Sequence, residues 1–217
     1  MKAAAGNIDA YRSTFPSEAL RTPAVAAEVA KRLMGAGRTM EAGQVLKAAG
    51  PAQTKVKGAK AKAREAEPDY DWETVWIDYL DQSGQPEAAQ DVRWASFERT
   101  LSADRAKAFT RRLADFHDVE VEGRAFAHAA GHCDFERGLR FLMEWPALPE
   151  AARMIEVRAE ELRISDEQAE LWACQLRLRQ PKAAHTLLRK AAAAAFRRGE
   201  LGTCDRFTKE ADTIELG

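Results

Sequence analysis

The sequence predicts an all-α fold in which antiparallel helix pairs stack as a short α-solenoid of about 10–12 helices. The 217 residues include 43 Ala and 17 Leu but only 14 Val and Ile together, and Ala and Leu favour helices whereas β-branched side chains do not. No Asn-Gly or Asp-Gly pair marks a β-hairpin. Each of the eight prolines stands at the edge of an apolar-periodic segment, where its missing N–H does least harm.

The first helix pair is expected within residues 1–51. Thr22 reads as an N-cap and Pro23 as the first helical residue, so we expect a helix over 23–37. Gly37 can end it, because glycine permits a left-handed turn. Thr39 then starts a second helix over 40–50.

A charged segment over 52–69 interrupts this pattern. Its basic residues are followed by acidic ones, namely Lys55, Lys57, Lys60, Lys62 and Arg64, then Glu65, Glu67, Asp69, Asp71 and Glu73. Because it has almost no apolar side chain, we interpret it as a flexible, solvated linker before a helical-repeat core over 70–217. The basic half could alternatively contact nucleic-acid phosphates. It has no aromatic residue to stack on a base, however, and the acidic residues that follow would repel the same backbone.

The core after the linker is expected to contain nine helices. They cover 70–84, 86–101, 103–116, 119–131, 135–146, 150–162, 166–179, 181–198 and 203–215. Their start signals are Ser102, Asp118, Asp134, Pro149, and Ser165 with Gln168 as a capping box. Connections this short place neighbouring helices antiparallel.

An internal period favours a solenoid over a closed bundle. Small residues followed at +3 and +4 by large apolar groups occur at Ala42, Gly138 and Ala184, and in part at Ala89, where Arg93 takes the +4 place. The intervals between them are 47, 49 and 46 residues. A small residue lets the helix backbone approach its neighbour closely, and helix pairs that cannot bury their apolar stripe alone stack on one another. Chance recurrence in an Ala-rich chain is the alternative explanation.

Three strings give the sequence a family resemblance. They are RWASFERTLS at 93–102, LADFHDVE at 113–120 and FLMEWP at 141–146. With them, the region from about Asp9 to Ala211 resembles an uncharacterised, mainly proteobacterial family of helical-repeat proteins, known only as a domain of unknown function. Its members are similar to tetratricopeptide-like solenoids and, more weakly, to helical segments of SWIM zinc-finger proteins. The resemblance implies a fold but no activity, and it carries no catalytic residue over to this chain.

Histidines and a cysteine cluster where a metal site is conceivable. His128 and His132 are four residues apart and share a helix face, and His117 and Cys133 lie nearby. The intervening residues lack the Glu of an HExxH motif, and Gly131 is expected to end the helix before His132. We therefore expect no metal or other cofactor: His128 should half-cover a helix groove, and His132 and Cys133 should form a turn.

The remaining chemistry points to a binding protein and not to an enzyme. The sequence has no GxSxG, Walker or GxGxxG motif. The aromatic residues lie mostly on apolar stripes, so core packing is expected, with Tyr70 and Trp72 as alternative exposed anchors for a partner. Several arginines could line a groove, namely Arg111, Arg112, Arg124, Arg137, Arg140 and Arg153.

We therefore expect a non-enzymatic scaffold that binds a protein or peptide, with a nucleic-acid-associated role through 55–64 as the alternative and a metallohydrolase as a third possibility. The net charge of −1 gives no general attraction to nucleic acid or membrane. No apolar run approaches the ~20 residues of a membrane span. Three cysteines without a CxxC pair suit a reducing cytoplasm.

Overall fold

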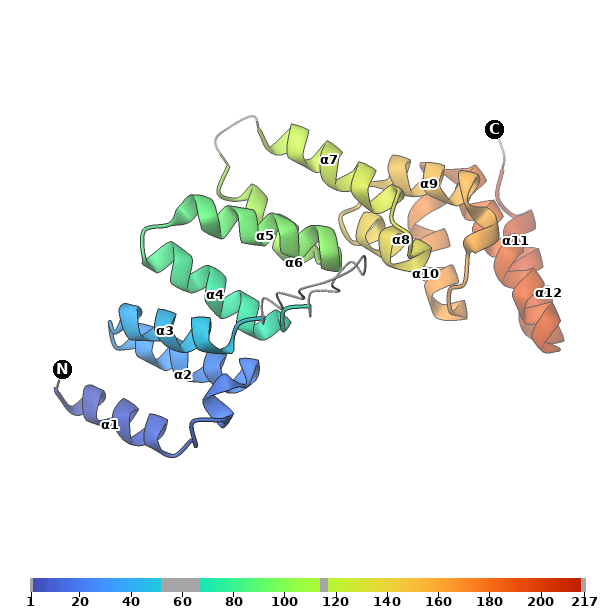
Figure 1. Cartoon of the computed structure of the whole chain (residues 1–217). Helices are drawn as coiled ribbons and strands as arrows, with labels where there is room; N and C mark the ends of the chain where they lie inside the picture. Colours follow the sequence, from blue (N-terminus) through green and yellow to red (C-terminus); the bar gives the residue numbers. More distant parts are fainter. Residues whose placement is uncertain (1, 52–66, 114–116, 216–217) are drawn as a thin grey trace, which may run out of the picture. The chain divides into compact units, whose positions relative to one another are not determined.

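A computed structural model describes residues 2–51, 67–113 and 117–215, with backbone alone for 2–7 (Figure 1). Over these residues the chain is all-helical and contains no strand. The chain divides into two compact units, Met1–Arg93 and Trp94–Gly217. The first contains α1 (Lys2–Ser13), α2 (Pro23–Gly35), α3 (Thr39–Ala49) and α4 (Tyr70–Gln82). Helix α5 (Pro86–Thr100) includes the division.

The second unit continues with seven described helices. They are α6 (Ala103–Thr110), α7 (Asp118–Ala130), α8 (Phe135–Glu144), α9 (Leu148–Val157), α10 (Asp166–Leu176), α11 (Pro181–Arg198) and α12 (Leu201–Asp212). Within each unit, neighbouring helices pack against each other, as predicted for a helical-repeat solenoid. In the described part of the chain, no helix combines the length and apolarity that a bilayer crossing requires.

Helices α2, α3 and α4 share one hydrophobic core in the first unit. Leu33 and Leu46 are completely buried in it, and Ile77 and Leu80 are buried beside them. Residues 52–66 of the predicted linker lie outside the described residues. The apolar stripe of α4 packs on α2 and α3, and Trp72 donates from Nε1 to the Leu46 carbonyl at 3.1 Å.

Helix α1 was not among the helices predicted from the sequence. A charged cluster attaches it to the rest of the unit: Arg38 donates to Asp9 of α1 and to Glu41 of α3, each at 2.7 Å. These hydrogen bonds raise the pKa of Arg38 and lower the pKa of Glu41. The Arg32 guanidinium also lies over the ring of Tyr11 in α1, 3.5 Å from the ring centroid, in a cation–π contact.

Several start and stop signals act as predicted, although Thr22, the predicted N-cap of α2, forms no side-chain capping hydrogen bond. Pro23 stands in the first turn of α2, and Gly37 follows it with φ of +76°. Gly84, with φ of +78°, forms the corresponding left-handed turn between α4 and α5. A left-handed φ costs glycine little because it has no Cβ. Ser165 and Gln168 form the predicted capping box at the start of α10.

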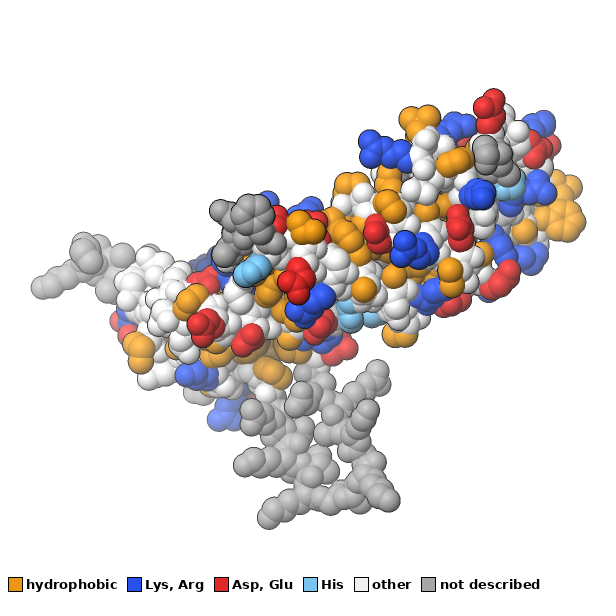
Figure 2. All heavy atoms as spheres, turned by 90° about the horizontal axis from the view of Figure 1, so that it is seen from above, with side chains coloured by type: hydrophobic (Ala, Val, Ile, Leu, Met, Phe, Trp, Pro, Cys, Tyr) orange, Lys and Arg blue, Asp and Glu red, His pale blue; other side chains and the backbone are white. Residues whose placement is uncertain are grey.

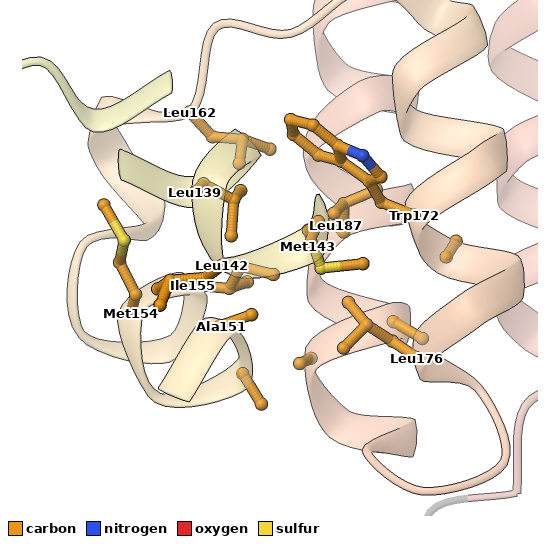
Figure 3. Packing of buried hydrophobic residues seen from close by; sticks show 14 of the residues in the cluster. Leu139, Leu142, Met143, Ala151, Met154, Ile155, Leu162, Trp172, Leu176 and Leu187 are labelled. Carbon is orange, nitrogen blue, oxygen red and sulfur yellow. The ribbon is translucent and has the colours of Figure 1, made fainter. Parts of the chain in front are cut away.

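The core of the second unit joins α8 and α9 to α10 and α11 (Figure 3). Leu139 and Leu142 of α8 point toward Ile155 of α9, and Trp172 and Leu187 face them from α10 and α11. Leu139, Leu142, Ile155 and Leu187 have no exposed surface. Burial of each such side chain contributes roughly 1.5–3 kcal/mol to folding.

The predicted small residues occupy equivalent places. Ala42, Ala89, Gly138 and Ala184 are each the fourth residue of their helix, in α3, α5, α8 and α11, and all are buried. The same place holds a buried Ala in four further helices, at Ala26, Ala106, Ala151 and Ala169. A Cβ added at Gly138 would overlap the carbonyl oxygen of Ala129 in α7. The close helix approach inferred from the sequence is therefore present.

Arg93 is the exception at the +4 place. Leu46, Leu142 and Leu188 fill this place in the other repeats with no exposed surface, and Arg93 is only 1 % exposed. Its guanidinium pairs with Asp81 of α4 and donates to Gln90 at 2.9 Å. An unpaired cation at such depth would be strongly destabilising, so Asp81 allows an arginine to replace a leucine here.

Two predicted helix ends were wrong by five or more residues, and the helices expected to end at 179 and 215 end three residues earlier, at Leu176 and Asp212. The helix expected over 103–116 ends at Thr110, and residues 111–113 form turns; residues 114–116 are outside the described part. The helix expected over 150–162 ends at Val157, because Arg158 leaves helical geometry with φ −117° and ψ 26°. Helix α12 begins at Leu201, two residues before the predicted start.

Candidate functional site

The basic residues of the predicted nucleic-acid contact, Lys55, Lys57, Lys60, Lys62 and Arg64, lie outside the described residues. Tyr70 and Trp72 are described. Tyr70 begins α4 and is 41 % exposed, whereas Trp72 is buried and stacks on Trp76 with 5.7 Å between ring centroids. Of these two candidate anchors, Tyr70 lies at the surface and Trp72 belongs to the core.

The histidines satisfy local backbone groups. His128 is half-buried, and its Nε2 lies 2.8 Å from the carbonyl oxygen of Glu98, which can only accept, so Nε2 donates. His132 Nδ1 accepts from the backbone N–H of Asp134 at 3.1 Å, in the turn that also contains the exposed Cys133. This agrees with the expected groove cover and turn. Across the described ranges, no group of three or more His, Cys, Asp or Glu side chains is arranged to hold a metal ion.

Two of the three strings quoted above, 93–102 and 141–146, contribute to an aromatic cluster in the second unit. Neighbouring ring centroids are 5.1 to 6.3 Å apart along the series Trp94, Phe97, Phe141, Trp145 and Phe126. Phe97 and Phe141 are buried, and the two tryptophans are half-buried. Cations cover these tryptophans: Arg124 lies 4.3 Å from the Trp94 ring centroid and Lys107 lies 5.8 Å from that of Trp145. Phe126, at the end of the series, reaches an open groove.

This groove, of about 320 Å³, lies between α7 and α9. Phe126, Ala127 and Ala130 line it from α7, and Met154 and Val157 line it from α9. Gly123 contributes no side chain, and a Cβ placed there would meet no atom within 4 Å. Val157 is 78 % exposed. The groove is therefore a largely apolar surface that is open to solvent.

Two charges border the groove. Glu150 and Arg153 of α9 line it one turn apart, and neither side chain forms an ion pair or hydrogen bond with another residue of the described chain. Arg153 was one of the arginines expected to line a groove. Both charges are thus available to a partner.

Arg158 closes one end of the groove. Its Nη1 donates to the carbonyl oxygens of Ala130 and His132 at 2.8 and 3.0 Å. Its Nε and Nη2 donate to the Glu161 carboxylate at 2.8 and 2.7 Å. These last bonds raise the pKa of Arg158 and lower that of Glu161. The cation satisfies carbonyl groups at the C-terminal end of α7, which would otherwise lack a partner, and so fixes α9 against α7.

Comparison with known proteins identifies the family. The model of a family of unknown function, DUF6880, matches residues 2–209. The chain belongs to this family. No curated protein and no solved structure matched the sequence of this DUF6880 chain.

The DUF6880 chain has a second groove, of about 310 Å³, between α8 and α10. Its lining is more polar and includes Arg140, Glu144, Gln168 and Gln175. Arg140, a second arginine expected to line a groove, pairs with Glu136 at 2.6 Å. Because this charge is already paired and the lining is less apolar than that of the α7–α9 groove, the α7–α9 groove is the stronger candidate for partner binding.

Sequence reasoning missed most residues of the α7–α9 groove. Gly123 interrupts an otherwise good helix, and such a glycine signals close backbone approach or open space. Met154 is buried and Val157 is 78 % exposed, and that both line a groove could not be seen without the position of α7.

Proposed function

We propose that this DUF6880 chain is a non-enzymatic scaffold that binds a protein or peptide partner in the groove between α7 and α9. We further propose that it is a tetratricopeptide-like, cytoplasmic, bacterial protein, as its sequence resemblance and cysteine content suggest. The observation that carries the proposal is the apolar groove itself, with a 78 % exposed Val157 beside two charged side chains without partners among the described residues. Interfaces combine such an apolar centre with a polar rim.

The surface chemistry supports a protein partner. In the view of Figure 2, basic and acidic side chains are interspersed, and no broad field of one sign covers the described surface on that face. Hydrogen bonds from its own backbone and from Ser165 lower the pKa of Glu167. A hydrogen-bonded Arg or Lys lowers the pKa of Glu41, Glu160 and Glu200. Surface ion pairs of this kind serve stability and solubility, whereas an acid–base catalyst needs a pKa tuned toward neutrality.

Site-specific photocrosslinking in the native host tests the proposal. A benzophenone amino acid is placed at Val157 and, as a control, at Leu178, which is 91 % exposed on another surface. We expect a distinct crosslinked protein from position 157 and not from 178, and we expect it to disappear when Gly123→Leu fills the groove. The absence of a crosslink at 157, or the same products at both positions, would contradict a partner in this groove.

A nucleic-acid-associated role is the alternative. It depends on the five basic residues within 55–64 and on the weak resemblance to SWIM zinc-finger proteins. A salt titration with single-stranded and duplex nucleic acid separates the two proposals. Binding that weakens steeply with salt, and that is lost when the five basic residues are replaced, would favour this role.

A further inference from the structure

The length and floor of the α7–α9 groove suit a helix. Gly123, Ala127 and Ala130 lie along one side of α7 over about two turns, or roughly 10 Å at 1.5 Å per residue. Small residues allow a partner backbone to approach closely, and Phe126, Met154 and Val157 offer apolar contacts beneath it. This is the arrangement in which amphipathic helices bind, through apolar residues spaced three or four apart.

The two walls of the groove run in the same direction. Helix α8 lies between them in the chain and is joined to each by a short turn (Figure 1). Arg158, just after α9, bonds the carbonyls of Ala130 and His132 at the end of α7, so the two C-terminal ends are together. A helix running antiparallel to both walls would place its N-terminus near these C-terminal ends, and this orientation is the one that the helix dipoles favour.

The rim charges set the order of charges on such a helix. Along α9, Glu150 precedes Arg153 by one turn. An antiparallel occupant passes Arg153 first and Glu150 second, so an acidic residue must come one turn before a basic one. Acid before base at this spacing also stabilises an isolated helix better than the reverse order.

We infer that the groove binds an amphipathic α-helix of a partner protein, antiparallel to α7 and α9. The bound face carries apolar residues at i, i+4 and i+7, with Asp or Glu over Arg153 and Lys or Arg one turn later over Glu150. This inference rests on the proposed function and adds the chemistry of the partner.

A display selection tests this with the full chain. A library of 16-residue helical peptides, randomised at the apolar and charged positions, is selected on the wild-type chain. Enriched peptides are then measured by fluorescence anisotropy. We expect acid-before-base sequences to be enriched and to bind about fivefold or more tighter than their base-before-acid isomers, the effect of two partly exposed ion pairs. The double variant with Glu150→Lys and Arg153→Glu should reverse this preference.

Matched glycine variants show whether the groove is the site. Gly123→Leu places a side chain in the groove, and Gly202→Leu adds the same side chain in α12, where a Cβ also meets no atom within 4 Å. We expect tenfold or weaker binding with the first and no change with the second. Thermal melting of both variants shows whether they fold.

The outcomes separate the inference from the proposed function. If no peptide is enriched, or if enriched peptides are insensitive to Gly123→Leu, the helix inference is overturned, while a crosslink from position 157 would still support a partner of another conformation. Equal binding of both charge orders, or no reversal by the double variant, overturns the antiparallel orientation.

Discussion

The same substitution, Gly to Ala, should have opposite effects at Gly123 and Gly138. Both glycines lie inside helices of the second unit, where alanine is preferred by about 0.5–1 kcal/mol. At Gly123 the new methyl group meets nothing within 4 Å, so Gly123→Ala should raise the free energy of unfolding by about that amount.

At Gly138 the new methyl group has no room. It would overlap the Ala129 carbonyl oxygen, a backbone atom that cannot turn aside, and it would lie 3.1 Å from Met154 Cε. Overpacking of this kind costs about 1–3 kcal/mol, which exceeds the helix-propensity gain. We therefore expect Gly138→Ala to lower stability by about 1–2 kcal/mol, so that the free energies of unfolding of the two variants differ by about 1.5–3 kcal/mol.

Urea unfolding followed by circular dichroism at 222 nm measures both effects, and thermal melting should show midpoints separated by about 3–12 °C. A Gly138→Ala variant as stable as the wild type would refute the close approach of α8 to α7. A destabilising Gly123→Ala would show that the space beside α7 is filled, and the groove proposal would fail with it.

Three further predictions concern stability. Asp81→Ala leaves the buried guanidinium of Arg93 without its anion and should lower the free energy of unfolding by about 3 kcal/mol, as measured by urea unfolding. A double variant with Arg93→Leu and Asp81→Ser should regain most of this stability. Additive losses in the double variant would contradict the pairing. Ser165→Ala removes half of the capping box and should cost about 1 kcal/mol in the same assay, whereas no loss would show the cap to be unimportant. Arg158 holds the pKa of Glu161 below its ordinary value of 4.5, so the charged carboxylate stabilises the fold above that pH, and this contribution is lost as the pH falls through the lowered pKa. When the melting temperature is measured between pH 6 and 3, it should fall less steeply with decreasing pH for Glu161→Gln than for the wild type. The same pH dependence in both proteins would argue against the ion pair.

The local signals of the sequence were sufficient for most helix starts. Pro23, and Ser165 with Gln168, act through neighbours three or fewer residues away, and such contacts depend little on the rest of the fold. The repeat was also visible, because small residues at Ala42 and Gly138 are required wherever two helices approach closely.

The end of α9 was not visible, because its cause is distant in the chain. Residues 158–162 continue the helical apolar period, yet Arg158 leaves the helix to bond carbonyl groups of residues 26 and 28 positions earlier. The groove was hidden for the same reason, since it needs α7 and α9 side by side. The sequence identified Arg153 as a candidate for lining a groove, but it did not indicate which helices form that groove.

The buried guanidinium of Arg93 makes one hairpin of the repeat array distinct from the rest. Helices that carry leucine at this place need only an apolar neighbour, so they could exchange partners during folding or duplication without leaving a charge exposed to hydrocarbon. Helix α5 can settle only against a helix that supplies a carboxylate where Asp81 stands. The order of the hairpins along the chain is therefore encoded by one cation and its anion, and an engineered array that repeats α5 must repeat α4 with it.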